Sequence, residues 1–330
     1  MKCKIKNAKC KKAADTVIFA FCILYFAFFL LSACAALPEA EPASPTPQPT
    51  PTPLLMPYDD AVATAEAGGD AAARAAAYYE RGNVQLDHGE MAAAIADYDR
   101  ALALDPKNAR AFNNRALAHA TLGHLDQALA DYGAAIRLDG GYVRAYKNRL
   151  SLLEQQGDLR GMAADYASLA ALEPANRADY RYGQGSALRG LGDLAGARRA
   201  YNAALDADPQ HVDALYERAL LSFAEGRTAA AIADLDYALR LSPRAANAYY
   251  ARGLAYSARG DNGRAIADFT TALGLRPDYA EALLGRATAF HAIGGTAQAR
   301  EDLDRLEKLE IDEPLKAAAA ALSAQLSSVP

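Results

Sequence analysis

The sequence predicts an all-α solenoid of seven helix-turn-helix repeats, closed at its C-terminal end by a capping helix. The chain of 330 residues is rich in alanine and has no long β-branched run after residue 35, which favours helices over strands. Seven glycines recur at intervals of 34 or 35 residues, and five prolines follow the same period, as expected of a repeat array. These prolines are Pro106, Pro174, Pro209, Pro243 and Pro277.

Each repeat is counted so that its recurring glycine takes position 15, where glycine lets the chain leave the first helix in a left-handed conformation. The repeats then begin at Ala75, Ala109, Val143, Ala178, Val212, Ala246 and Ala280. The glycines are Gly89, Gly123, Gly157, Gly192, Gly226, Gly260 and Gly294.

The other recurring positions describe two packed helices. Positions 20, 24 and 27 share one face of the second helix, and position 24 is bulky in every repeat. In six repeats a small residue at position 8 lets the helices approach closely, and in six a bulky residue at position 4 fills the space beside them. Proline at position 32 ends the second helix in five repeats. One pair cannot bury its apolar face, so stacked pairs share a continuous core.

This pattern resembles the tetratricopeptide repeat (TPR) over residues 75–311, and runs such as 94–102 and 265–269 are typical of it. The resemblance implies a right-handed superhelical solenoid that binds other proteins through a concave surface. Two departures stand out. No tryptophan occupies position 4, and a one-residue insertion near Ala175–Arg177 delays repeat 4, so that its position 4 is Arg181. We expect the insertion to bend the solenoid and divide its groove.

A correlation between two positions predicts structural ion pairs. Position 7 is arginine and position 23 is aspartate in the same six repeats, whereas repeat 4 has Gln184 and Ala200. Because both partners are lost together, we expect each arginine to pair within its own repeat. In the pairs Asp97/Asp99, Asp234/Asp236 and Asp302/Asp304 we expect one paired and one solvated carboxylate.

Two segments flank the repeats. Residues 58–74 are rich in alanine and glycine, and the sequence favours a short leading helix there without fixing it. Residues 312–330 contain Pro314 and then an expected capping helix, Leu315 to Leu326, followed by a tail.

Residues 1–33 resemble a bacterial lipoprotein signal peptide. A lysine-rich start and an apolar stretch, 17–33, precede Leu31-Ser32-Ala33-Cys34, which resembles the lipobox. The resemblance implies cleavage before Cys34 and lipidation of its thiol. The alternative is an uncleaved transmembrane helix over 17–37, near the ~20 residues that span a bilayer. Both interpretations place the remainder outside the cytoplasm.

Residues 34–57 comprise the expected lipidated cysteine and a Pro/Thr-rich linker. The proline content of this linker favours an extended polyproline-II conformation. All four cysteines lie within the first 34 residues, so the repeats have no disulfide and no thiolate metal site. The formal net charge of the whole chain is −5, although residues 1–33 hold six lysines. The rest of the chain is therefore more acidic still, which does not suit a nucleic-acid binder.

Signatures of catalysis or cofactor binding are missing. The chain has no His-Glu-x-x-His, P-loop or Gly-x-Ser-x-Gly motif, and its five histidines share no i, i+4 face. We therefore expect that the protein is not an enzyme and that it binds no metal ion and no cofactor.

The remaining candidate is the concave surface, which the TPR resemblance assigns to first-helix positions 2, 5, 6, 9, 12 and 13. Asn83, Asn114 and Arg144 have the spacing of the family's two-carboxylate clamp, with Tyr79 replacing its first lysine and Asn148 its last arginine. Position 5 supplies an aromatic row suited to an extended peptide. The candidate residues for partner binding are Asn83, Arg110, Asn113, Asn114, Arg144, Lys147, Asn148, Tyr182, Tyr216 and Tyr250.

The function predicted from these features is a non-enzymatic, membrane-anchored scaffold that binds a peptide or partner protein for cell-envelope assembly or recruitment. Two alternatives remain. One is a binder of a small molecule or glycan, with Tyr182, Tyr216 and Tyr250 stacking on a ring, and the other is an enzyme.

Overall fold

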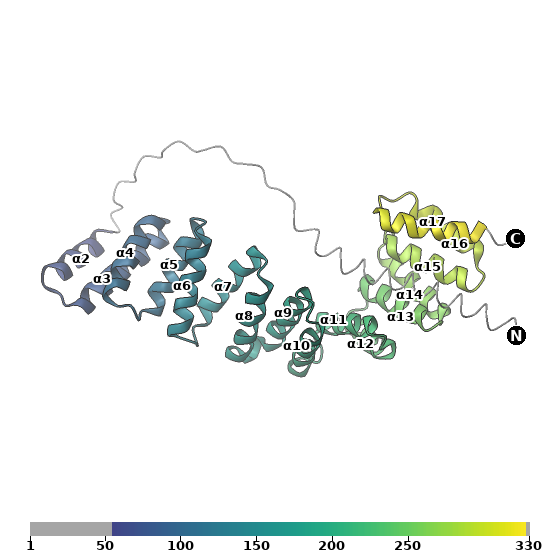
Figure 1. Ribbon diagram of the computed structural model, residues 1–330, viewed down its shortest axis with the longest axis horizontal. Helices are drawn as coiled ribbons and strands as arrows, with labels where there is room; N and C mark the ends of the chain where they lie inside the picture. The colour runs from purple at the N-terminus through teal and green to yellow at the C-terminus, as the bar shows by residue number, and fades with distance from the viewer. Residues whose placement is uncertain (1–54, 328–330) are drawn as a thin grey trace. The chain divides into compact units, whose positions relative to one another are not determined.

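The computed structural model describes residues 55–327, and in that part of the chain all regular structure is helical (Figure 1). The first helices of the seven repeats are α3 (Ala71–Asp87), α5 (Ala109–Thr121), α7 (Val143–Gln156), α9 (Arg177–Gly190), α11 (Val212–Ala224), α13 (Ala246–Ala258) and α15 (Ala280–Ala292). The second helices are α4 (Met91–Leu104), α6 (Leu125–Leu138), α8 (Leu159–Leu172), α10 (Leu194–Ala207), α12 (Thr228–Leu241), α14 (Asn262–Leu275) and α16 (Thr296–Leu306). The flanking helices are α2 (Met56–Gly68) and α17 (Glu313–Ser327), and a 3-10 helix, η1, spans Pro174–Asn176.

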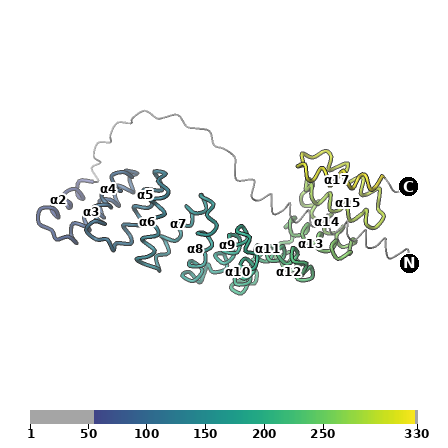
Figure 2. Tube along the Cα trace, viewed as in Figure 1, coloured from purple at the N-terminus to yellow at the C-terminus, as the bar shows by residue number. Residues whose placement is uncertain are grey.

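The helices fall into two compact units that divide between Ala207 and Asp208. The N-terminal unit holds α2 to α10, and the C-terminal unit holds α11 to α17; within each, consecutive helices pack on one another, as the trace shows (Figure 2). The insertion lies inside the N-terminal unit, where η1 absorbs the extra residue and α9 begins at Arg177. The expected bend of the solenoid and division of its groove at the insertion stay predictions.

The recurring glycines have the predicted conformation. Between residues 55 and 327, these seven glycines alone have a left-handed backbone, with φ from 69° at Gly157 to 84° at Gly294. A side chain is strained at such a φ, so glycine at position 15 fixes the turn between the two helices of each repeat.

Glycine at position 8 lies against a large residue at position 24, and this contact confirms the predicted close approach of the two helices. A Cβ atom added to Gly82 would lie 2.9 Å from Tyr98 Cε1, and one on Gly185 would lie 2.5 Å from Tyr201 Cε1. Both tyrosines are fully buried. In repeats 1 and 4 an aromatic ring of the second helix therefore packs directly on the glycine backbone of the first helix.

All six predicted Arg–Asp pairs are confirmed, and in each one the Nε and Nη2 atoms of the arginine donate to the two carboxylate oxygens. In Arg81–Asp97 these distances are 2.7 and 2.8 Å. The other pairs are Arg115–Asp131, Arg149–Asp165, Arg218–Asp234, Arg252–Asp268 and Arg286–Asp302. Five of the six aspartates are buried, so these pairs belong to the core.

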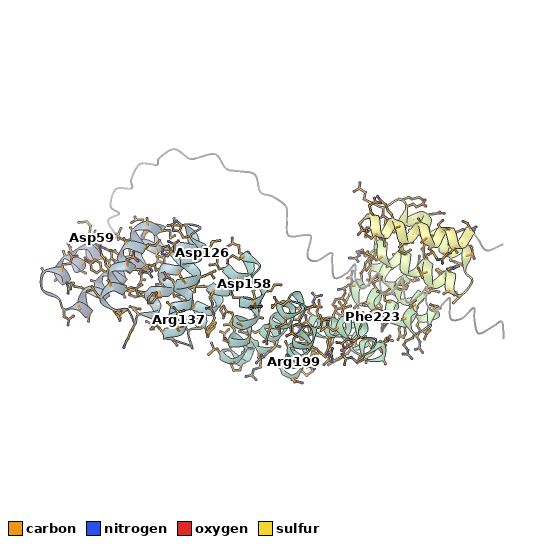
Figure 3. The ribbon with its side chains drawn as sticks, in the orientation of Figure 1. Asp59, Asp126, Arg137, Asp158, Arg199 and Phe223 are labelled. Carbon is orange, nitrogen blue, oxygen red and sulfur yellow. The ribbon has the colours of Figure 1, made fainter. Side chains whose placement is uncertain are left out.

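The leading helix predicted within 58–74 is present, but α2 begins at Met56, two residues earlier. Pro57 lies in its first turn, where a missing backbone N–H leaves no hydrogen bond unmade. The first helix of repeat 1 also starts early, at Ala71, because the Asp70 side chain accepts a hydrogen bond from Ala73 N and caps it. Asp59 of α2, labelled in Figure 3, receives Arg81 Nη1 at 2.9 Å.

The predicted capping helix is confirmed as α17, whose Leu322 and Leu326 are buried in a core that includes Leu303 and Leu306 of α16. The last repeat therefore has its apolar face covered. The predicted signal peptide, Cys34 and nearly all of the linker lie outside the described residues. Across residues 55–327, no helix combines the length and the apolarity that a bilayer crossing requires.

Candidate functional site

Asparagines on three first helices form a chain of hydrogen bonds, which we call the asparagine ladder (Asn83, Asn114, Asn113, Asn148). Asn114 Nδ2 donates to Asn83 Oδ1 at 2.9 Å, and Asn113 Nδ2 donates to Asn114 Oδ1 at 3.0 Å. Asn148 Nδ2 then donates to Asn113 Oδ1 at 3.1 Å. The hydroxyl of Tyr98 donates to Asn83 Oδ1 at 3.0 Å, so the ladder is also tied to the core of repeat 1.

The ladder changes the interpretation of the asparagines predicted to bind a partner. Asn113 is only 1% exposed, so it is a link inside the ladder and not a contact for a ligand. Asn83, Asn114 and Asn148 are half-buried. Asparagines predicted as separate ligand contacts therefore form one polar strip that joins repeats 1, 2 and 3.

Two exposed cations lie beside this strip. Arg110 and Arg144 are both exposed, and within residues 55–327 neither forms an ion pair. Burial raises the pKa of Tyr142, the residue that precedes α7, whereas Arg144 and Arg110 both lower it. Both guanidinium groups thus lower the pKa of one hydroxyl, and Tyr79 raises it. The result is a basic patch, defined by Arg110, Tyr142 and Arg144.

Lys147, the third predicted cation, is already paired. Its Nζ lies 2.9 Å from Glu173 Oε2, and the hydroxyl of Tyr180 donates to the same carboxylate. Hydrogen bonds from Tyr180 and Lys147 hold the pKa of Glu173 below its ordinary value. Lys147 thus links α7 to the segment that precedes η1, and less of its charge is available to a ligand.

The predicted aromatic row does not form one open surface. Tyr250 is 3% exposed, and its ring lies 5.0 Å from that of Tyr279 and 5.9 Å from that of Phe269, so it belongs to the core. Tyr216 is half-buried and packs against buried residues of the C-terminal unit. Tyr182 belongs to the N-terminal unit, where its ring lies 6.0 Å from that of Tyr201. The first-helix face is polar in repeats 1–3, and the position-5 tyrosines of the later repeats serve packing.

The structure brings together two histidines that the sequence search passed over. Nδ1 atoms of His119 and His124 lie 3.4 Å apart, because the turn at Gly123 folds the loop back on α5. A search for i, i+4 spacing misses this contact, since the residues are five apart across a turn. Two rings do not complete a metal site, and the described residues contain no group of three or more His, Cys, Asp or Glu placed to hold a metal ion.

Models of one repeat family match most of the repeat region. A family model described as tetratricopeptide repeat matches residues 182–246 and 250–314, and another with the same description matches 109–142. A model described as TPR repeat matches residues 82–123. Helix pairs of one period with shared cores define an α-helical repeat protein. The chain belongs to the tetratricopeptide repeat family.

The fold is similar to that of a solved TPR structure. The C-terminal part of a TPR repeat-containing protein from Cytophaga hutchinsonii is 15% identical, with a TM-score of 0.55 over 73% of this chain and 98% of that chain. YrrB, a TPR protein with an unusual peptide-binding site, is 20% identical, with a TM-score of 0.47 over 56% and 95%. PilW, a type IV pilus biogenesis factor, is 20% identical, with a TM-score of 0.48 over 63% and 97%. None of the curated proteins matches the chain.

Proposed function

We propose that this chain is a non-enzymatic scaffold that binds an extended segment of a partner protein along the first helices of repeats 1–3. The basic patch and the exposed edge of the asparagine ladder make the contacts. A lipid on Cys34 holds the protein outside the cytoplasm, where it assembles or recruits envelope proteins. Family membership supports the general part of this proposal, since TPR proteins generally bind other proteins and are generally not catalysts.

One observation carries the proposal of a binding surface: Arg110 and Arg144 are exposed, form no ion pair within residues 55–327, and both lower the pKa of the same residue, Tyr142. Elsewhere in the repeats, position-7 arginines are neutralised by buried aspartates. Arg110 and Arg144 occupy position 2 of their repeats, and no aspartate neutralises either of them within residues 55–327. Guanidinium groups bind carboxylates in a bidentate manner, so the patch suits an acidic side chain or a C-terminal carboxylate of the partner.

The ladder supports the same proposal by fixing the shape of the surface. Its four amides are held to one another, so the three first helices present a rigid polar face that loses little entropy on binding. Extended peptides have regularly spaced backbone donors and acceptors, and half-buried amides such as Asn83 and Asn148 are suited to pair with them. The burial of Tyr250 weakens the alternative of a small-molecule or glycan site that uses the three tyrosines as a row.

The anchor is supported by the sequence around Cys34. Two or more acyl chains on that residue give stable membrane attachment, and the Pro/Thr-rich linker gives reach above the surface. Cells are grown with an alkyne-bearing palmitate analogue, and labelled protein is detected in a gel. We expect label on the wild-type chain and on Cys22→Ala, and none on Cys34→Ala. Equal labelling of Cys34→Ala would show that the lipid lies elsewhere.

The binding surface is tested by crosslinking the full chain in its native envelope and recovering it by an affinity tag. The test variant is Arg110→Gln with Arg144→Gln, and the control is Arg137→Gln, an exposed arginine on the second helix α6. We expect one partner to be captured by the wild type and the control and lost from the double variant. Capture of the same partner by all three chains would place the binding surface elsewhere.

A further inference from the structure

Repeat 4 differs from the other repeats because its arginine has no aspartate partner. In repeats 1, 2, 3 and 6 an aromatic ring at position 4 lies under the arginine at position 7, as Phe112 lies under Arg115 with 5.4 Å from Cζ to the ring centroid. Repeat 4 has arginine at position 4, Arg181, and Gln184 at position 7. Position 23, aspartate in the others, is Ala200. The repeat therefore keeps a guanidinium and lacks the carboxylate that would neutralise it.

The contacts of Arg181 confirm this difference. Its Nη1 donates to Gln184 Oε1 at 2.8 Å, a neutral acceptor that leaves the positive charge uncompensated. The side chain is half-buried, in contrast to the exposed cations of the surface. A partly desolvated guanidinium without an anion is unfavourable, and an anionic ligand relieves that cost.

The inserted residue brings a second guanidinium to the same place. Arg177 is the residue that lengthens repeat 3 to 35 positions, and α9 starts at it. Its Nε donates to Ala170 O of α8 at 3.2 Å, which fixes the side chain across the end of that helix. In the described part of the chain, neither Arg177 nor Arg181 forms an ion pair.

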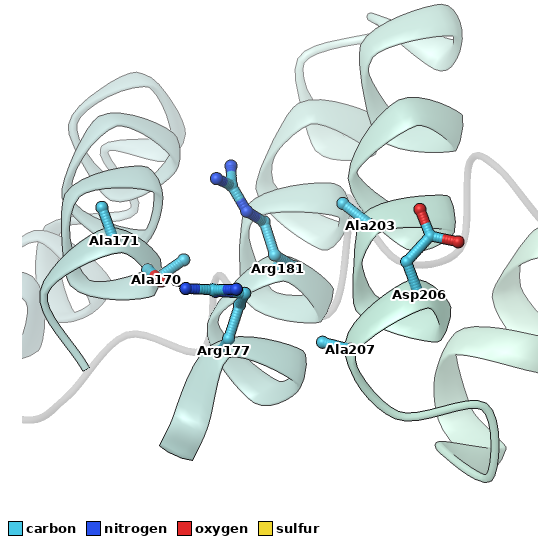
Figure 4. A pocket seen from close by; sticks show the side chains of 7 residues that line it. All are labelled: Ala170, Ala171, Arg177, Arg181, Ala203, Asp206 and Ala207. Atoms are coloured by element: carbon cyan, nitrogen blue, oxygen red, sulfur yellow. Dashed lines mark hydrogen bonds between the residues drawn. The ribbon is translucent and has the colours of Figure 1, made fainter. Parts of the chain in front are cut away.

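A cavity of about 410 Å³ opens between α8, α9 and α10, beside these two side chains. Figure 4 shows the guanidinium groups on α9 between alanines of α8 and α10, with Asp206 on the α10 side. The lining residues are Ala170, Ala171, Arg177, Arg181, Ala203, Asp206 and Ala207. None of them occupies a first-helix groove position, so this cavity is separate from the basic patch.

The chemistry of the lining selects a ligand class. Two guanidinium groups against one carboxylate leave one net positive charge, which matches a single carboxylate better than a dianionic phosphate. The four alanines give an apolar wall for methylene groups. We propose that the cavity is a second binding site, which takes a carboxylate on a short aliphatic chain, as in a glutamate side chain of a protein or a small free acid.

The test uses the full chain in mild detergent and ligand-detected NMR titrations. The probes are N-acetyl-glutamate N-methylamide, its glutamine analogue, glutarate and inorganic phosphate. We expect saturable binding of the carboxylates and none of the glutamine analogue. Tighter binding of the capped glutamate assigns the site to a protein side chain, and tighter binding of glutarate assigns it to a free acid. The proposal is overturned if phosphate binds most tightly, if the glutamine analogue binds as well as the glutamate, or if nothing saturates.

Three variants locate the binding. Arg177→Gln with Arg181→Gln removes both cations, and Ala203→Leu fills the cavity while keeping them; each is expected to weaken binding at least about tenfold. Arg160→Gln changes an exposed arginine at the other end of α8 and is expected to bind as the wild type does. Circular dichroism establishes that each variant is folded. Wild-type affinity in both folded cavity variants would place the ligand elsewhere and contradict the proposal.

Discussion

Arg115 Nη1 lies 2.6 Å from Asp99 Oδ1, so the guanidinium of repeat 2 contacts a carboxylate of repeat 1. Because its Nε and Nη2 are bound to Asp131, one side chain joins its own helix pair to the preceding one. Arg252 does the same with Asp268 and Asp236. The second aspartates of these Asp-x-Asp pairs are therefore links between repeats, which corrects the expectation that they are only solvated.

The two ion pairs of Arg115 contribute differently to the free energy of unfolding. Arg115→Gln leaves Asp131, whose side chain is 9% exposed, without its charge partner, and we expect the free energy of unfolding to fall by about 3–5 kcal/mol. Asp99→Asn removes a partner that is 57% exposed, with an expected loss below about 1 kcal/mol. Urea denaturation followed by circular dichroism measures both. Equal losses of unfolding free energy in the two variants would contradict the expectation that burial of the aspartate determines how much each ion pair stabilises the fold.

The contact of Gly185 with Tyr201 limits the size of the residue at position 8. Gly185→Ala places a methyl group 2.5 Å from the tyrosine ring, and we expect a loss of about 1–3 kcal/mol from overpacking. Gly185→Ala combined with Tyr201→Leu should recover part of it, because repeat 5 pairs Ala219 with Leu235. Thermal unfolding of the single and double variants checks this. Wild-type thermal stability of Gly185→Ala alone would contradict the close approach of the two helices.

Asn113 is predicted to contribute to stability as a link in the ladder. Asn113→Ala removes the donor to Asn114 and the acceptor for Asn148, and the expected loss is about 1–3 kcal/mol because those groups lie half-buried. Gln127→Ala, an exposed amide on α6, serves as the control with an expected change near zero. Hydrogen exchange of α5 and α7 should quicken only in Asn113→Ala. Unchanged exchange would show that the ladder does not hold the helices.

The histidine pair predicts a pH dependence of stability. Burial lowers the pKa of His119, and Arg115 and His124 lower it further, while Asp131 and Asp99 oppose them. The unfolded chain therefore binds the proton more readily, so the free energy of unfolding should fall as the pH drops through about 6.5. Replacing His119 by glutamine should flatten this slope between about pH 7 and about pH 5. Denaturation midpoints across that range test it, and a wild-type slope in the variant would contradict it.

The sequence predicted those features that depend on positions within one repeat. The left-handed glycines and the six Arg–Asp pairs follow from a period that repeats seven times, so each is supported by several independent positions. Contacts between repeats were not predicted, because they depend on how neighbouring pairs stack. Asp99 with Arg115 and the asparagine ladder are of this kind.

The candidate site was predicted less completely than the fold. Periodicity places Arg110 and Arg144 on the first helices, but it does not report burial, so it does not separate the buried Asn113 and Tyr250 from exposed groove residues. The pairing of Lys147 depends on Glu173, which lies at the insertion where the repeat pattern is interrupted. The cavity of repeat 4 has the same origin, because an irregular repeat has no counterpart from which to predict it.

Site-specific photo-crosslinking tests the central claim most directly, which is that a partner lies along the first helices of repeats 1–3. A photoreactive amino acid is introduced in the full chain at Leu117 or Ser151, exposed position-9 residues of α5 and α7, or at Ala103 or Arg137, exposed residues of the second helices α4 and α6. The account predicts one crosslinked partner from Leu117 and Ser151, lost on Arg110→Gln with Arg144→Gln, and none from Ala103 or Arg137. Crosslinks from the second helices alone would contradict it.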